Sequence, residues 1–189
     1  FRSDIDHFYL KSKFYLFSIF FYNMIPACST CNSKAKRNNK SKHVNPYLED
    51  MNSLSCFEIK DDYKMSFITN IDAQYDDKKI EEQVNSFDIN LKCNSSTAQN
   101  TDRLFQLMAR YNELKPKMEL LRNFQMYWSN CPKNVASILD EHIDHVYDIF
   151  CGKMGITPDE NNINRRKFSK LNRDILKNYI LSLKRGEVQ

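Results

Sequence analysis

The sequence predicts an α+β protein in which a small strand–strand–helix unit precedes a short strand-rich patch and a mostly helical C-terminal region. Three observations predict this class. Two short strand-like segments lead into a segment without Gly or Pro, hydrophobic residues alternate loosely between positions 52 and 95, and apolar residues recur at helical spacing beyond position 100. We assign residues 1–50 to the strand–strand–helix unit and residues 51–189 to a mixed, then mainly helical, accessory region.

The strand–strand–helix unit is predicted element by element. Residues 3–8 form the first strand, which ends at Asp6 and His7. Residues 11–22 form a long connecting loop whose aromatic side chains pack beneath the site. Residues 23–27 form the second strand, and residues 29–37 form the short helix because they contain neither Gly nor Pro.

The accessory region begins with strands and continues with helices. Residues 56–59 and 65–68 are predicted as strands, residues 78–84 as a short helix, and residues 94–101 as a polar turn or linker. Apolar spacing then predicts helices near residues 104–127, 133–150 and 168–183. Pro116 either kinks the first of these helices or starts a new one.

Side chains between positions 6 and 32 suit the hydrolysis of a phosphodiester bond. Asp6 offers a hard oxygen ligand for a divalent cation, and Asn32 can add a neutral oxygen to the same cation. His7 can take a proton from water near neutral pH. Cys28 and Cys31 have the spacing of half of a four-cysteine zinc site.

This stretch resembles the HNH endonucleases. The resemblance is carried by D-I-D-H-F-Y at residues 4–9, Y-N-M-I-P-A-C-S-T-C-N-S-K at 22–34 and N-P-Y at 45–47. K-K-I-E-E-Q-V-N-S-F at 78–87 and F-S-K-L-N-R-D-I-L at 168–176 are more weakly similar to later segments of such proteins. The resemblance implies a ββα-metal core that cleaves DNA, with His7 as general base and Asn23 fixing the loop that aims it.

The resemblance also implies that Cys28 and Cys31 pin the strand to the helix through a structural zinc. The family often carries a first Cys-x-x-Cys before the motif, so we expect an upstream segment and a half-built zinc site in this chain. Leu10 stands where the family usually has Pro, and Ala35-Lys36 stands where Lys-Gly is common. The four other cysteines have no framework-like spacing and indicate a reducing compartment: Cys56, Cys93, Cys131 and Cys151.

The charge of the chain is distributed unevenly. The net charge is +4 over residues 1–50, −6 over residues 51–163 and +6 over residues 164–189. The candidate nuclease motif is therefore basic, and a phosphate backbone is attracted to it. A cluster without acidic residues follows the predicted helix and is either a phosphate-binding tail or a solvated loop: Lys34, Lys36, Arg37, Lys40 and Lys42.

Two other clusters leave alternatives open. His142 and His145 lie among acidic residues, either as ligands of one metal or on an exposed acidic face. The basic residues at positions 165–173 form either a second DNA contact or the wet cationic face of a helix.

These observations predict a metal-dependent HNH endonuclease that hydrolyses DNA, with Mg²⁺ or Mn²⁺ held by Asp6 and Asn32 and a structural Zn²⁺ half-site. The alternative is a non-catalytic, zinc-containing nucleic-acid-binding module. Such nucleases serve in anti-phage defence and in mobile elements, so a partner protein of a defence system is a further expectation. The apolar run at residues 14–25 is too short to cross a bilayer and lacks a signal-peptide cleavage pattern. We therefore expect a cytoplasmic protein without membrane contact.

Overall fold

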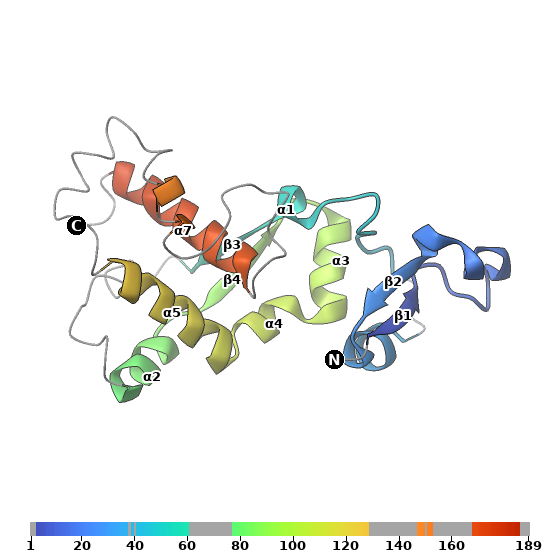
Figure 1. Cartoon of the computed structure of the whole chain (residues 1–189), viewed down its shortest axis with the longest axis horizontal. Coiled ribbons are helices and arrows are strands. Elements are labelled where there is room, and N and C mark those ends of the chain that lie inside the picture. Colours follow the sequence, from blue (N-terminus) through green and yellow to red (C-terminus); the bar gives the residue numbers. More distant parts are fainter. Residues whose placement is uncertain are drawn as a thin grey trace. The chain divides into compact units, whose positions relative to one another are not determined.

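The computed structural model describes residues 3–37, 39, 41–60, 77–128, 147–149, 151–152 and 168–185. Within these residues the fold mixes helices with two small antiparallel sheets, as the predicted α+β class requires (Figure 1). The chain divides into two compact units. The N-terminal unit comprises Phe1–Ser55 and Cys93–Leu107, and the second unit comprises Cys56–Lys92 and Met108–Gln189.

A β-hairpin and a short helix form the part of the N-terminal unit that carries the motif. Strand β1 (Asp4–His7) pairs antiparallel with β2 (Met24–Ala27), and helix η3 (Thr30–Lys36) follows. The helix is wide, because the amide of Arg37 donates across five residues to the carbonyl of Asn32 at 3.0 Å. Strand, strand and helix therefore follow in the predicted order, each shorter than predicted.

The loop between β1 and β2 is exposed, and the prediction that it packs beneath the site is wrong. It contains two 3₁₀ turns, η1 (Tyr15–Ile19) and η2 (Phe21–Asn23). Its exposed large side chains are Tyr9, Phe14, Tyr15, Leu16, Phe17, Ile19, Phe20, Phe21 and Tyr22. Two strands of four residues offer too little surface to bury so many rings. The rings instead contact one another, with centroids of Phe14 and Phe17 6.3 Å apart and those of Phe17 and Phe20 6.2 Å apart.

Helix α3 (Ser96–Phe105) completes the N-terminal unit beside η3 and the segment that follows it. The amide of Val44 donates to Thr101 Oγ1 at 2.8 Å, and Asn100 Nδ2 donates to the carbonyl of Lys42 at 2.9 Å. A turn or linker was predicted here, and that prediction is wrong. Ser95 caps the helix by accepting a hydrogen bond from the amide of Ala98, so a polar segment begins a helix.

The second unit contains most of the second sheet and the longer helices. Its sheet consists of β3 (Ser55–Ile59) and β4 (Ile89–Cys93). The first residue of β3 and the last residue of β4 belong to the N-terminal unit. Its helices are α2 (Asp77–Asn85), α5 (Leu114–Trp128), α7 (Ser169–Lys184) and all but the first residue of α4 (Leu107–Tyr111). Helix α1 (Met51–Leu54) lies in the N-terminal unit. Helix α2 packs on α5, whose first turn contains Pro116 without interruption. Strand β3 confirms the strand predicted at residues 56–59, whereas β4 was not predicted.

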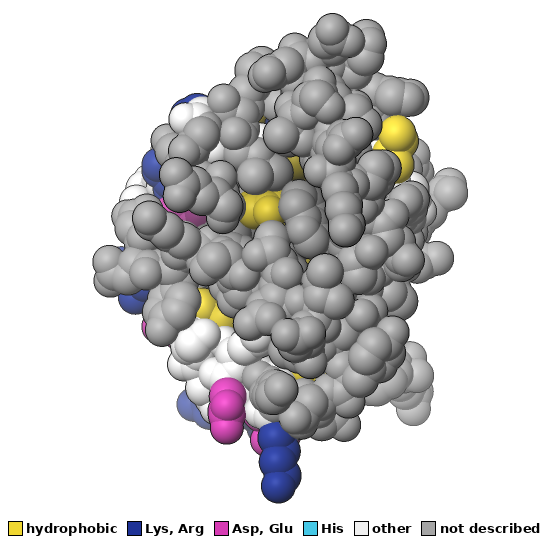
Figure 2. Space-filling model, turned by 90° about the vertical axis from the view of Figure 1, so that its left-hand side faces the viewer, with side chains coloured by type: hydrophobic (Ala, Val, Ile, Leu, Met, Phe, Trp, Pro, Cys, Tyr) yellow, Lys and Arg dark blue, Asp and Glu magenta, His cyan; other side chains and the backbone are white. Residues whose placement is uncertain are grey.

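Helix α7 is largely buried, which corrects one of the two interpretations of its basic residues. Lys170 and Arg173 bind the buried carboxylate of Asp174, at 2.8 Å and 3.3 Å, instead of forming a wet cationic face. The same carboxylate accepts a hydrogen bond from the amide of Phe57 at 3.0 Å, which ties α7 to β3. Figure 2 shows one face of the molecule, on which Lys, Arg, Asp and Glu side chains of the described residues lie at the left and lower edges and small hydrophobic areas are visible.

Several predictions fall outside the described residues. They concern Lys40, the strand at 65–68, Cys131, most of the helix at 133–150 with His142 and His145, and residues 165–167. No helix within the described ranges combines the length and the apolar character that crossing a bilayer requires.

Candidate functional site

One hollow of about 510 Å³ in the N-terminal unit brings three predicted site residues together. Asp6, His7 and Asn32 all line it, the first two from β1 and the third from η3. We call it the site hollow. Its other lining residues are Ile5, Leu10, Lys11, Ser12 and Arg37. An aspartate, a histidine and an asparagine therefore line one opening, together with Lys11 and Arg37.

Asp6 has a partner that the sequence did not reveal. Lys36 Nζ donates to Oδ1 and Oδ2 of Asp6 at 2.8 Å and 2.7 Å, and to the carbonyl of His7 at 2.6 Å. These contacts occupy all three hydrogens of the ammonium group. Lys36 is only 1% exposed, so its predicted role in gripping DNA is wrong. The wide helix η3 turns this side chain inward, toward β1.

The imidazole of His7 is oriented by the loop between the strands. Its Nε2 lies 2.9 Å from the backbone carbonyl oxygen of Ser18. A carbonyl oxygen only accepts hydrogen bonds, so Nε2 carries the proton and the neutral ring has its lone pair on Nδ1. The arrangement suits a general base, because the nitrogen that takes up a proton is distinct from the one that holds the ring in place.

The side chain of Asn23 holds the same loop through hydrogen bonds to its backbone. It is 2% exposed, and its Oδ1 accepts from the amide of Tyr9 at 2.6 Å. Its Nδ2 donates to the carbonyls of Tyr9 and Phe17 at 3.3 Å and 2.9 Å. Phe17 precedes the residue whose carbonyl binds His7. Asn23 therefore has the contacts needed for the predicted loop-fixing role.

The residues of the site hollow fit a divalent cation that keeps most of its waters. Each oxygen of Asp6 accepts one hydrogen bond from Lys36, while a carboxylate oxygen has two lone pairs. Each oxygen of Asp6 therefore keeps one lone pair that Lys36 does not use. The amide of Asn32 lines the same hollow. Mg²⁺ commonly binds through one or two protein groups and retains several waters.

Cys28 and Cys31 form a turn at the start of η3. The amide of Cys31 donates to Sγ of Cys28 at 3.2 Å, so the chain folds back over the first sulfur. Among the residues that the structure describes, no three His, Cys, Asp or Glu side chains gather as a metal-binding group. The half-built zinc site therefore stays a prediction.

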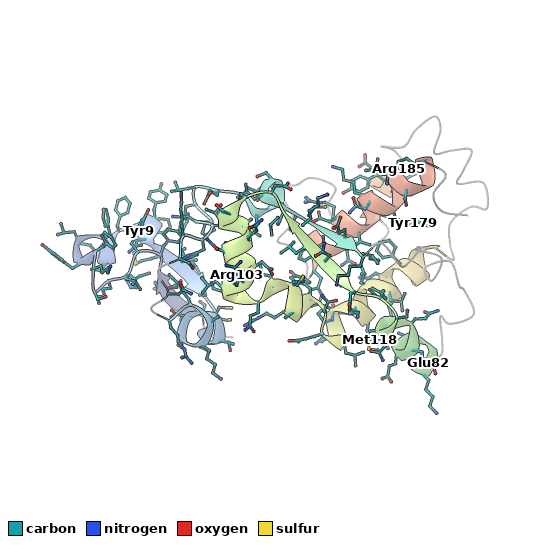
Figure 3. All side chains as sticks on the ribbon, turned by 180° about the vertical axis from the view of Figure 1, so that it is seen from behind. Tyr9, Glu82, Arg103, Met118, Tyr179 and Arg185 are labelled. Atoms are coloured by element: carbon teal, nitrogen blue, oxygen red, sulfur yellow. The ribbon has the colours of Figure 1, made fainter. Side chains whose placement is uncertain are left out.

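The basic residues near the site divide by exposure. Lys34, Arg37 and Lys42 are exposed and available to a phosphate backbone. Arg103 on α3 joins this set and was missed in the sequence, because no local pattern relates it to the motif. It lines a polar hollow of about 460 Å³ with Lys34, and Figure 3 shows its place on α3.

His43 is a second residue that the sequence did not single out. It is buried, and its ring lies 4.6 Å from that of Phe8, centroid to centroid. Burial lowers the pKa of His43, while its hydrogen bond with the carbonyl of Ser41 acts in the opposite direction. The charge of Lys36 lowers this pKa further, and that of Asp6 raises it. His43 thus responds to the same ion pair that lies beneath the site.

Comparisons of the chain with models of protein families, with curated proteins and with solved structures found no match.

Proposed function

We propose that this protein is a metal-dependent endonuclease of the HNH type that hydrolyses phosphodiester bonds of DNA. The observation that carries the proposal is the site hollow, in which Asp6, His7 and Asn32 lie together. A second observation supports it: the loop contacts of Asn23 and Ser18 hold His7 in the tautomer that a general base needs. The order of strand, strand and helix agrees with this type of site.

The proposed chemistry assigns each step to a residue of the hollow. Asp6 and Asn32 hold the cation, and His7 Nδ1 takes a proton from the attacking water. Lys11 and Arg37 line the same hollow and bind the non-bridging oxygens of the phosphate. A bound Mg²⁺ or Mn²⁺ supplies charge stabilisation at the scissile phosphate and at the leaving 3′ oxygen.

Lys36 gives a specific reason to keep a second candidate function. Its ammonium neutralises the carboxylate that a metal nuclease needs as a ligand. A protein in which Lys36 permanently replaces the metal is a non-catalytic nucleic-acid-binding module, with the basic surface intact and no cleavage. In the nuclease, added Mg²⁺ or Mn²⁺ binds at Asp6 and permits cleavage. In the binding module, Lys36 keeps the carboxylate of Asp6 and added metal has no effect there.

Incubation of the protein with supercoiled plasmid and Mg²⁺ or Mn²⁺ tests the proposal. We expect cleavage by the native protein and none by the Asp6→Asn variant, whose folded state is checked by circular dichroism because Lys36 loses its counterion. Asp4→Asn is the matched control, because Asp4 lies two residues earlier on β1 and is not among the residues that line the site hollow. DNA binding without cleavage by all three proteins, at every metal concentration, would favour the binding module.

A further inference from the structure

A second hollow of about 450 Å³ lies beside the site hollow in the same unit, and the proposed chemistry does not use it. Its walls include the rings of Phe8, Tyr9 and Phe14, and we call it the aromatic hollow. Its volume falls within the range of about 300–1,000 Å³ that is usual for small-molecule sites. It is therefore large enough for one aromatic ligand.

The ring geometry of the aromatic hollow suits stacking. The centroids of Tyr9 and Phe14 are 5.6 Å apart with the ring planes at 64°, and Tyr9 meets Phe8 edge-on at 5.1 Å. Tyr9 and Phe14 are 45% and 44% exposed, so both side chains are partly open to solvent. Figure 3 shows Tyr9 among neighbouring aromatic side chains. Exposed ring faces of this kind bind bases of single-stranded nucleic acid by stacking.

The charges around the aromatic hollow favour a ligand with a phosphate. Lys13 and Lys42 are exposed and line it. One carboxylate, that of Glu49, also lines it and accepts a hydrogen bond from the amide of Asn45 at 3.4 Å. Among the described residues that line the aromatic hollow, two cationic side chains therefore accompany one acidic side chain, which already accepts a hydrogen bond from a backbone amide.

The two hollows are neighbours. Leu10 lines both of them. Along the chain, Asp6 and His7 line the site hollow, and the next two residues line the aromatic hollow. A strand whose phosphate lies at His7 can therefore place an adjacent base against Tyr9 and Phe14. Bases in a duplex are stacked inside the helix, so such a base must be unpaired or flipped out.

We propose that the aromatic hollow binds one unpaired base of the strand whose phosphate occupies the site hollow. The substrate is then single-stranded or locally unpaired nucleic acid. This inference rests on the proposed function, since it takes the site hollow as the place of the phosphate.

Binding without chemistry tests the inference, in buffer with EDTA and no divalent cation. The probes are a fluorescently labelled thymidine decamer and a decamer of abasic residues with the same phosphates. We expect the native protein to bind the thymidine decamer about fivefold or more tightly. This ratio should fall to near one in Phe14→Ala and in Phe14→Leu, which keeps apolar bulk without a ring. Phe21→Ala is the matched control from the same loop, at a side chain that is 63% exposed and is not among those that line the hollow.

Three outcomes overturn the inference. The first is that the native protein binds the two decamers with equal affinity, or that it binds neither of them. The second is an equal loss of the ratio in Phe14→Leu and Phe21→Ala. The third is displacement of the decamer by free thymidine monophosphate at concentrations similar to that of the decamer, which assigns the hollow to a mononucleotide. Plasmid cleavage is measured separately. If the protein cleaves plasmid but binds the two decamers equally, the proposed nuclease activity is supported and the role of the aromatic hollow is overturned. If it binds the thymidine decamer more tightly but does not cleave plasmid, the role of the aromatic hollow is supported and the nuclease proposal is overturned.

Discussion

The ammonium nitrogen of Lys36 lies 2.7 Å from one carboxylate oxygen of Asp6 and 2.8 Å from the other. The side chains of Lys36 and Asp6 are 1% and 12% exposed. The pair joins the last residue of η3 to β1, so it connects the two elements that supply the site hollow. Because the pair is buried, the loss of one partner leaves a charge in a poorly solvated position. The ion pair thus links the stability of this unit to the shape of the site.

We expect Lys36→Met to lower the free energy of unfolding by about 3–5 kcal/mol, because Asp6 keeps a buried charge without its counterion. Urea denaturation followed by circular dichroism measures the change. The double variant Lys36→Met/Asp6→Asn should recover most of the loss. Lys34→Met, on the exposed side of the same helix, should stay within about 0.5 kcal/mol of the native protein. Equal losses of unfolding free energy in Lys36→Met and Lys34→Met would show that the ion pair contributes nothing specific to stability.

We expect His7→Ala to reduce the rate of metal-dependent plasmid cleavage by about 10²–10⁴-fold, the usual contribution of a general base. DNA affinity should change little, because the imidazole acts in the chemical step and does not bind the phosphate backbone. Gel-based cleavage and fluorescence anisotropy measure the two effects. Ser18→Ala is the control, since His7 contacts the backbone carbonyl of Ser18 and not its hydroxyl. Unchanged cleavage by His7→Ala would contradict the assignment.

We expect Asn23→Ala to destabilise the loop between β1 and β2 by about 1–3 kcal/mol, because the substitution removes the partner of backbone groups in Tyr9 and Phe17. The exposed aromatic residues of that loop are cleavage sites for chymotrypsin. Limited digestion should therefore cut the variant in this loop faster than the native protein. Asn39→Ala, at an exposed position, is the control. Equal digestion rates for the two variants would count against a loop-fixing role.

We expect the stability of the N-terminal unit to fall as the pH drops below about 6.5, the ordinary pKa of histidine. Burial lowers the pKa of His43 in the folded state, so the unfolded chain binds a proton first. The contribution of the neutral ring is thus complete above the unfolded pKa and is lost as the pH falls through the folded one. Urea midpoints at about pH 7.5 and about pH 5.5 measure the effect. His43→Phe should show a smaller difference between the two midpoints, and an unchanged difference would contradict this origin.

Local pattern alone was enough to predict the elements that carry the motif. The order of strand, strand and helix follows from short apolar segments and from a stretch without Gly or Pro, and each element lies within its predicted range. Asp6 and His7 were placed correctly at the end of a strand for the same reason. These features depend on residues that are neighbours in the sequence, where alternation and helix breakers act directly.

Contacts between distant residues decided the rest. The sequence showed Lys36 as one of several basic residues, and only its burial against Asp6, 30 positions away, turned it into a structural counterion. Helix α3 reaches the motif through the hydrogen bond of Val44 to Thr101, across 57 positions, and brings Arg103 with it. The loop between β1 and β2 was predicted to be buried because apolar residues usually lie inside a protein. It is exposed because four-residue strands cannot cover it, and whether an apolar segment is buried depends on the surface that the rest of the fold can offer.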